Sequence, residues 1–319
     1  MKLIIQLPCY NEEKTLAVAL SHLPKKVKGF KTVEWLIIND GSRDRTVEVA
    51  RKCGVHHIVS FTKNQGLARG FMAGLDACLM LGADVIVNTD ADDQYNADDI
   101  PLLVAPILAG EADVVIGARP IKNISHFSPI KKLLQGFGSM TVRIASRTEV
   151  ADAPSGFRAL SRDAAMRMNV FNEYTYTLET IIQAGQKNMA VASVPIRVNA
   201  DLRPSRLVKS IISYVKKSMT TILRIAIVYR PLKFFATIGT VLIILGVIPG
   251  VRFIWLAFTH AGPAGHTQSL ILSAILVILG AQMWVMGIMG DLLSVNRKLL
   301  EDILYRVKRI EFDGVKTKK

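Results

Sequence analysis

Cysteine is scarce in this sequence, which excludes a disulfide-stapled secreted domain. The chain of 319 residues contains three cysteines, Cys9, Cys53 and Cys78, an odd number with apolar residues around each. We therefore expect buried free thiols rather than disulfides, a redox centre or a metal site. The apolar start of the chain stops at Pro8, too early for a signal peptide, so the soluble part is expected to face the reducing cytoplasm.

Acidic residues are absent from one long stretch. No Asp or Glu lies between Leu202 and Gly290, whereas Arg and Lys recur between Arg203 and Lys233. The net charge of +14 fits nucleic acid, anionic lipid or phosphorylated substrates as partners. Few aromatic residues accompany the basic ones and no nucleic-acid-binding motif is present, which argues against nucleic acid. Because the basic residues flank long apolar runs, they are predicted to lie at a membrane surface.

The second half of the chain predicts a membrane anchor. Residues 203–230 are a basic stretch with apolar residues at helical spacing, typical of an amphipathic helix in the membrane interface. Residues 231–293 contain two apolar runs, about 232–258 and 269–291, each near the roughly 20 residues that cross a bilayer. The turn between them has no Lys or Arg, and residues 294–319 form a basic tail. By the positive-inside rule we expect a multi-pass protein of the inner, cytoplasmic membrane with both ends in the cytoplasm. Two helices buried in a soluble domain are the alternative.

Residues 1–202 predict an α/β domain with a doubly wound, mostly parallel sheet. Short runs rich in Val and Ile alternate with helical patterns, and the runs lack clean polar alternation, as in strands covered on both faces. The predicted strands are residues 3–7, 33–38, 57–61, 84–88 and 113–116, and the predicted helices are residues 12–23, 45–52, 67–81 and 97–108. Ligands of such sheets bind at the carboxyl ends of the strands. Polar clusters stand at three of these ends: residues 10–12, 39–42 and 90–92.

The acidic run after the fourth predicted strand is a candidate metal site. Asp90 and Asp92 stand two residues apart, so a turning chain can aim both carboxylates at one divalent cation. Hard oxygen ligands suit Mg²⁺ or Mn²⁺, and Gln94 could add a carbonyl oxygen. A solvated acidic loop would show the same pattern.

Three motifs in order resemble the family 2 glycosyltransferases of the GT-A, Rossmann-like fold. They are residues 7–13 (LPCYNEE), 38–46 (INDGSRDRT) and 89–94 (TDADDQ). Within that family the chain is similar to polyprenyl- and dolichyl-phosphate sugar synthases, of the dolichyl-phosphate mannose synthase and undecaprenyl-phosphate glucosyltransferase types. The resemblance covers about residues 1–230, and the two apolar runs match some members.

The resemblance implies a nucleotide-sugar site and its metal. The donor-binding positions would be Pro8, Tyr10, Asn11, Glu12, Asp40, Arg69, Asp90 and Ala91, with Asp90, Asp92 and Gln94 on the metal. Asp40 would read the base, because a carboxylate accepts from base N–H groups. Two alternatives stay open here: Asp40 as a turn residue, and the loop before Arg69 as an ordinary helix start.

The resemblance also implies an acceptor site made of cations. Arg119 matches a G-x-R position and Arg203 an R-x-S-K/R segment, so Arg119 and Arg203 join Asp92 as the expected catalytic residues, with Arg206 and Ser139 as further acceptor contacts. For Arg203 and Arg206, simple attraction to anionic headgroups is the alternative. Two further questions stay open: whether Asp93 is a bystander or a base, and whether Asp152 or Ser155 touches sugar.

The expected function is therefore the inverting transfer of a sugar from a UDP- or GDP-hexose to a polyprenyl phosphate. The acceptor phosphate is already anionic, so positioning and charge compensation would supply most of the catalysis. The alternatives are transfer to another lipid or glycan, or an inactive membrane scaffold. Small residues such as Gly239, Gly246 and Gly250 leave room for helix contacts and so allow a homo-oligomer.

Overall fold

A computed structural model describes most of the chain in two compact units. The first unit comprises residues Met1–Ser218 and Ile303–Lys319, and the second comprises Met219–Asp302. The described residues are 1–120, 146, 148–170, 176–199, 220, 227–259 and 267–316. Most of the predicted amphipathic helix, residues 203–230, lies outside them, as do Ser139, Arg203 and Arg206.

The first unit is built on a seven-stranded sheet, which confirms the predicted α/β class. Its strands are β1 Lys2–Cys9, β2 Thr32–Asn39, β3 His57–Ser60, β4 Val85–Asn88, β5 Val114–Ala118, β6 Arg158–Ser161 and β7 Val191–Pro195. Their order is β3-β2-β1-β4-β6-β5-β7. Only β6 runs against its neighbours, β4 and β5, among these strands. The residues that precede β6 therefore lie at the same edge as the carboxyl ends of the other strands.

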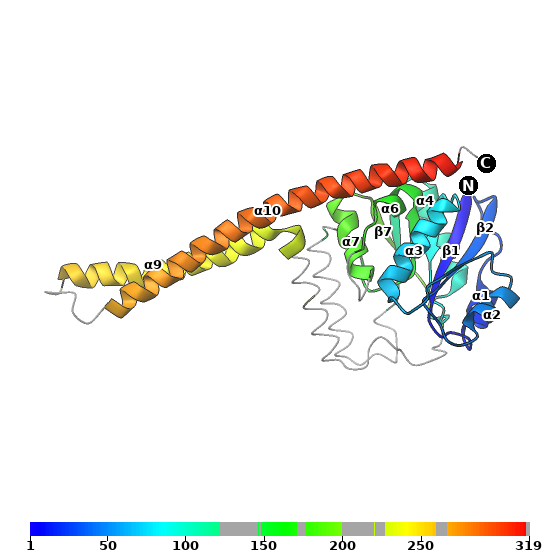
Figure 1. Cartoon of the computed structure of the whole chain (residues 1–319), viewed down its shortest axis with the longest axis horizontal. Coiled ribbons are helices and arrows are strands. Elements are labelled where there is room, and N and C mark those ends of the chain that lie inside the picture. The colour runs from blue at the N-terminus through cyan, green and yellow to red at the C-terminus, as the bar shows by residue number, and fades with distance from the viewer. Residues whose placement is uncertain are drawn as a thin grey trace. The chain divides into compact units, whose positions relative to one another are not determined.

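Helices cover both faces of this sheet. They are α1 Leu16–His22, α2 Thr46–Lys52, α3 Leu67–Met80, α4 Ile100–Leu108, α6 Arg162–Arg167 and α7 Thr177–Gln186, with a short 3₁₀ helix, η1 Ala97–Asp99. Helix α3 packs on β1 and β2 (Figure 1). On the other face, Leu3, Ile5 and Leu7 of β1 join one apolar core with residues of α1 and α4. Burial on both faces explains why β1 reads as a nearly continuous apolar run.

The first predicted helix begins later than expected. The pattern predicts a helix from residue 12, but α1 begins at Leu16. Asn11 adopts a left-handed backbone conformation with φ 54°. The backbone N–H of Glu12 donates to Thr46 Oγ1 rather than starting a helical ladder. The loop before α1 is therefore shaped by its neighbour loop and not by helix propensity.

The last turns of the C-terminal helix, α10 Thr267–Lys316, are part of the first unit. Lys308 Nζ pairs with Asp76 of α3 at 2.8 Å, and the Tyr305 hydroxyl donates to Asp163 of α6 at 2.5 Å. Phe312 is 2% exposed, and its carbonyl oxygen accepts from Arg162. The tail expected from residue 294 onward is thus helical as far as Lys316, and its end packs on α3 and α6.

The second unit contains two helices that are long and apolar enough to cross a membrane. They are α9, Pro231–Thr259, and the first part of α10. Only 6% and 17% of their most apolar windows are buried, which is unlike the core helices of a soluble domain. The two pack through small residues: a Cβ on Gly239 would lie 2.6 Å from the Gly280 oxygen, and one on Gly246 would meet Leu276. These glycines therefore serve contacts within the chain itself.

Loss of the Phe312 side chain should loosen the C-terminal helix from the first unit. We expect Phe312→Ala to destabilise the unit by about 3 kcal/mol, because a buried aromatic ring leaves a cavity. The matched control is Ile310→Ala, two residues away and 77% exposed, which should change stability by no more than about 0.5 kcal/mol. Thermal unfolding of the detergent-solubilised protein measures both, and equal melting temperatures for the two variants would contradict the packing role.

Candidate active site

The loops after β1 and β2 hold each other at the carboxyl edge of the sheet. The backbone N–H of Asn11 donates to Ser42 Oγ at 3.0 Å, and Asn11 Oδ1 accepts from the N–H of Arg43 at 2.9 Å. Glu12 is 6% exposed, and its carboxylate accepts from the Thr15 hydroxyl. The segment predicted to bind the base and ribose is therefore ordered by reciprocal hydrogen bonds before any ligand arrives.

Asp40 holds the start of helix α3. Its carboxylate is buried and accepts from the backbone N–H groups of Gln65 at 2.6 Å and Gly66 at 2.9 Å. Glycine is required beside it, because Gly41 has φ 68° and a Cβ there would lie 2.5 Å from the backbone of Lys63. The sequence left open whether Asp40 is a turn residue or binds the base. In the structure its carboxylate holds the backbone of residues 65 and 66, and its contact with a base stays a prediction. Arg69 is exposed on α3 and bonds to the side chain of Gln65.

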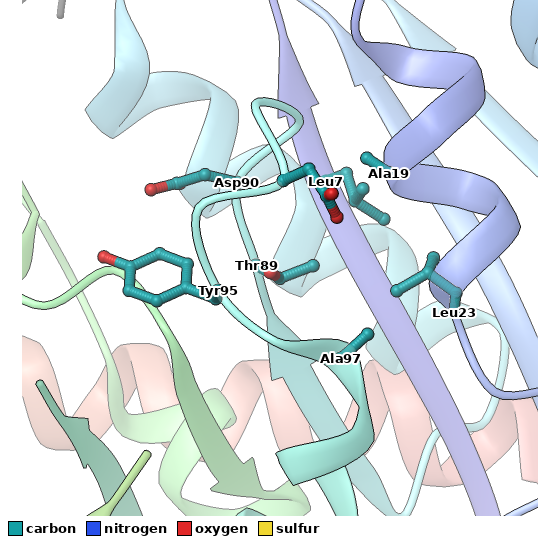
Figure 2. Close-up of a pocket in the computed structure, with 8 residues that line it drawn as sticks. Leu7, Ala19, Leu23, Thr89, Asp90, Tyr95 and Ala97 are labelled. Carbon is teal, nitrogen blue, oxygen red and sulfur yellow. The ribbon is translucent and has the colours of Figure 1, made fainter. Parts of the chain in front are cut away.

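The acidic run follows β4, as predicted. Asp90 approaches the segment before β6: a Cβ on Gly156 would lie 3.0 Å from Asp90 Oδ2. Asp92 Oδ1 accepts from the backbone N–H of Gln94 at 3.4 Å, and both residues are half-buried. Ala91 is 4% exposed and belongs to the apolar core that includes Leu7 of β1. A small pocket lies between this loop, β1 and α1, and Figure 2 shows Asp90 and Tyr95 on its border.

The donor set fits a divalent cation that keeps open positions for a substrate. Within the described ranges no group of three His, Cys, Asp or Glu side chains gathers into a complete metal cage. Asp90 and Asp92 stand two residues apart, and their carboxylates suit Mg²⁺ or Mn²⁺ when substrate phosphate oxygens supply further ligands. Asp90 and Asp92 are thus the described residues that would hold such a cation.

Tyr95 joins the acidic loop to the segment before β6. Its hydroxyl accepts from the Gly156 N–H at 2.9 Å, and its ring stacks on Phe157 at 5.1 Å between centroids. Burial, reinforced by nearby Asp90, raises the pKa of Tyr95 to about 12. Tyr95 is thus a neutral hydroxyl at physiological pH and cannot serve as a base there. The sequence reading missed this residue, although it directly follows the acidic motif.

Arg119 is held by Asp152 in a bidentate ion pair. Arg119 Nε lies 2.6 Å and Nη2 3.1 Å from the two oxygens of Asp152, which is 1% exposed. Burial alone would lower the pKa of Arg119, but the acidic groups around it, Tyr95, Asp152 and Asp90, raise it on balance. Arg119 therefore stays charged, with its Nε edge committed to Asp152. A ligand phosphate would have to meet its Nη1 edge.

Arg158 places a second positive charge near Asp90. Its side chain is fully buried, its Nη1 donates to Thr180 Oγ1 at 2.5 Å, and its Nη2 donates to the carbonyl of Ser155. Burial lowers the pKa of Arg158. In the described part of the chain no carboxylate lies within ion-pair distance of it, and Ser155 Oγ and Arg158 Nε have no hydrogen-bond partner there. This arrangement holds Ser155 and Gly156 under Asp90.

Comparison with known proteins assigns this arrangement to a family. The model of the family described as glycosyl transferase family 2 matches residues 4–168, more than half of the 319 residues. The chain belongs to glycosyl transferase family 2. It is therefore a glycosyltransferase, as the three motifs implied.

Named relatives of this glycosyltransferase act on lipid phosphates. It is 27% identical over 216 residues to the UDP-N-acetylglucosamine–dolichyl-phosphate N-acetylglucosaminyltransferase of Methanococcus voltae, covering 60% of this chain and 83% of the relative. It is 25% identical over 231 residues to the undecaprenyl-phosphate mannosyltransferase of Micrococcus luteus, covering 69% and 93%.

A solved structure shares the fold of the glycosyltransferase. The glucosyl-3-phosphoglycerate synthase of Mycobacterium tuberculosis, in complex with Mn²⁺, UDP-glucose and phosphoglyceric acid, matches with a TM-score of 0.54 and 20% identity. The match covers 69% of this chain and 80% of that one. It confirms the GT-A fold.

A side chain at Gly156 should disturb Asp90. The Cβ of Gly156→Ala would lie 3.0 Å from Asp90 Oδ2 and 3.1 Å from the Tyr176 hydroxyl, so one of them must move. We expect glycosyltransferase activity to fall about tenfold, because displacement of a site group by about 1 Å can cost up to roughly 100-fold in rate.

The control is Gly314→Ala, where an added Cβ meets nothing within 4 Å. It should leave activity unchanged, and circular dichroism should show both variants folded. Full activity in Gly156→Ala would show that Asp90 needs no fixed place against this segment.

Proposed function

We propose that this glycosyltransferase moves a hexose-type sugar from a nucleoside-diphosphate sugar to a polyprenyl phosphate at the cytoplasmic face of a membrane. The observation that carries the proposal is the acidic pair Asp90 and Asp92, half-buried at the carboxyl edge of the sheet. The dolichyl- and undecaprenyl-phosphate acceptors of the relatives support the choice of acceptor. Two helices able to cross a membrane support its place, with α9 and the first part of α10 as spans and both ends in the cytoplasm.

The donor would lie along the edge formed by the ends of β1, β2 and β4. Pro8, Tyr10, Asn11 and Glu12 would hold base and ribose beside Asp40, and Asp90 with Asp92 would hold a divalent cation. When bound, that cation would neutralise charge on the departing nucleoside diphosphate. The related fold solved with Mn²⁺ supports a divalent metal and leaves Mg²⁺ and Mn²⁺ as the two candidates. UDP-glucose is the first donor to test and GDP-mannose the second.

The acceptor phosphate would attack the anomeric carbon opposite the departing nucleotide. A phosphate oxygen is anionic near neutral pH, so no side chain needs to remove a proton from it. Arg119 would meet the phosphate through its Nη1 edge, and Arg203, Arg206 and Ser139 are proposed as further contacts. Bidentate guanidinium groups match phosphate geometry, and so the main work of these residues is orientation and charge compensation.

The proposal is tested by direct transfer. The full-length protein in detergent is incubated with labelled UDP- and GDP-sugars, undecaprenyl or dolichyl phosphate, and Mn²⁺ or Mg²⁺. We expect label in the lipid phase, its loss on chelation with EDTA, and a fall of about 100-fold or more in Asp92→Asn, because a metal contributes several kcal/mol to such a reaction.

Asp98→Asn is the control, because Asp98 is an exposed carboxylate six positions along the chain and should not hold the metal. Transfer that survives in Asp92→Asn would overturn the metal assignment. Donor binding without transfer to any lipid phosphate would overturn the acceptor assignment.

A further inference from the structure

We propose that Asp93 and Asn199 are positioning residues that hold the acidic loop so that Asp90 and Asp92 can face one cation. The inference rests on the proposed metal role of those two carboxylates. It also assigns Asp93, the third acid of the run, a part in the binding of the metal and none in proton transfer.

The backbone of Asp93 marks the point where the loop is constrained. Its φ is 59°, in the left-handed region that residues other than Gly, Asn and Asp seldom adopt. Such a residue costs about 1–3 kcal/mol and persists only when its surroundings hold it. The turn lies directly after Asp92, so the conformation of Asp93 sets the direction in which the chain leaves the proposed metal ligands.

The side chain of Asp93 is directed at helix α1. Its carboxylate is 7% exposed, and both oxygens lie 3.0 Å from Nδ1 of His22, in the last turn of α1. Asp90, three residues earlier, approaches Gly156 instead. Asp90 and Asp93 of the same loop thus face different elements, and Asp93 is bonded to α1.

The segment after β7 holds the other side of the loop. Asn199 Nδ2 donates to the carbonyl of Asp93 at 2.9 Å, and the Asn199 backbone N–H donates to the carbonyl of Gln94 at 2.9 Å. An isolated antiparallel bridge joins Tyr95 to Val198. The loop therefore leaves β4 at one end and is tied to residues 198–199 at the other, with Asp90 and Asp92 between these anchors.

A neighbouring ion pair extends this attachment. Arg197 donates through Nε and Nη2 to Asp99 Oδ1, at 2.9 and 2.7 Å, and its backbone N–H donates to Asp99 Oδ2. Asp99 is 2% exposed at the start of α4. Residues 93–99 thus run beside residues 197–199 as a short ladder, which makes the carbonyl of Asp93 a fixed acceptor for Asn199.

Anchoring of this kind acts by preorganisation. A cation binds tightly when its two carboxylates already point at one place, because no conformational freedom is then lost on binding. Removal of an anchor leaves both ligands present but lets them spread. The expected signature is a weaker metal affinity with the maximal rate recovered at high metal concentration.

The test measures Mn²⁺ affinity directly. Full-length protein in detergent with UDP present is titrated with Mn²⁺ by calorimetry or electron paramagnetic resonance. We expect Asp93→Ala to raise the Mn²⁺ Kd about tenfold or more and Asn199→Ala to raise it about threefold to tenfold. Asp93→Asn should have a milder effect than Asp93→Ala, because Asn tolerates the left-handed conformation.

The matched control is Asn188→Ala. Asn188 is also left-handed, with φ 52°, but it is exposed in the turn between α7 and β7. It should lose a similar amount of stability and leave the Mn²⁺ Kd unchanged. This separates a local effect on the loop from general destabilisation.

The turnover rate then separates positioning from proton transfer. If Asp93 positions the loop, kcat of Asp93→Asn returns to near the wild-type value at saturating Mn²⁺. A kcat that stays depressed at saturation, with an unchanged Mn²⁺ Kd, would overturn the proposal in favour of a base. Unchanged Kd values in both Asp93→Ala and Asn199→Ala would overturn it as well.

Failure of the proposed metal site would give a different result from failure of the positioning role. If wild-type protein with UDP binds no Mn²⁺, or binds it equally well in Asp92→Asn, the proposed metal site itself fails. If Asp92→Asn loses Mn²⁺ while the Asp93 and Asn199 variants do not, only the positioning role fails.

Discussion

The candidate active site lies at the carboxyl edge of the sheet, and this active edge depends on one constraint. The backbone groups where buried strands end must find hydrogen-bond partners within the protein. Strand β1 is buried on both faces, and Glu12 in the loop that leaves it is 6% exposed. This loop is satisfied by the loop after β2, through Asn11 with Ser42 and Glu12 with Thr46. Asp40 does the same for the start of α3. The loops at this edge hold one another in place because each supplies hydrogen-bond partners to the next.

This constraint divides the acidic residues of the edge into two kinds. Five are almost fully buried and bond to the protein: Glu12, Asp40, Asp93, Asp99 and Asp152. Asp90 and Asp92 remain half-buried, which leaves their carboxylates within reach of a ligand. A buried carboxylate without partners is costly, so each buried acid bonds to the framework, including Glu12 and Asp40, which are also proposed to meet the donor. Burial shows which acids the framework holds, and residue type does not.

Much of the fold was predictable from the sequence, for a physical reason. Strands β1, β2, β4 and β5 are runs of Val, Ile and Leu buried along most of their length, and their pattern carries that information. Strand β6 was missed because it is four residues long and begins with Arg158, a residue type that is rarely buried. Here Arg158 is fully buried against Tyr176 and helix α7. Strand β7 was missed because it is only partly buried and ends in Pro195.

The site was predictable only as far as local spacing reaches. Asp90 and Asp92 stand two residues apart after a strand, so the pair could be placed from the sequence. The pairing of Arg119 with Asp152 joins residues 33 positions apart, and that of His22 with Asp93 joins residues 71 apart. No periodicity encodes such contacts, since they follow from the order of strands in the sheet. The antiparallel β6 brings residues 152–157 to the active edge, and α1 brings His22 there.

These contacts bear on how the proposed reaction would proceed. Three of the described groups at this edge that have the chemistry of a base are already bonded within the protein or stay protonated. Asp93 faces His22, Asp152 holds Arg119, and the pKa of about 12 keeps Tyr95 protonated. An acceptor that had to lose a proton, such as a sugar hydroxyl, would find none of these three well placed to take it. A lipid phosphate is already anionic and needs only to be oriented. These bonds fit the proposed transfer to an anionic acceptor, which needs no base.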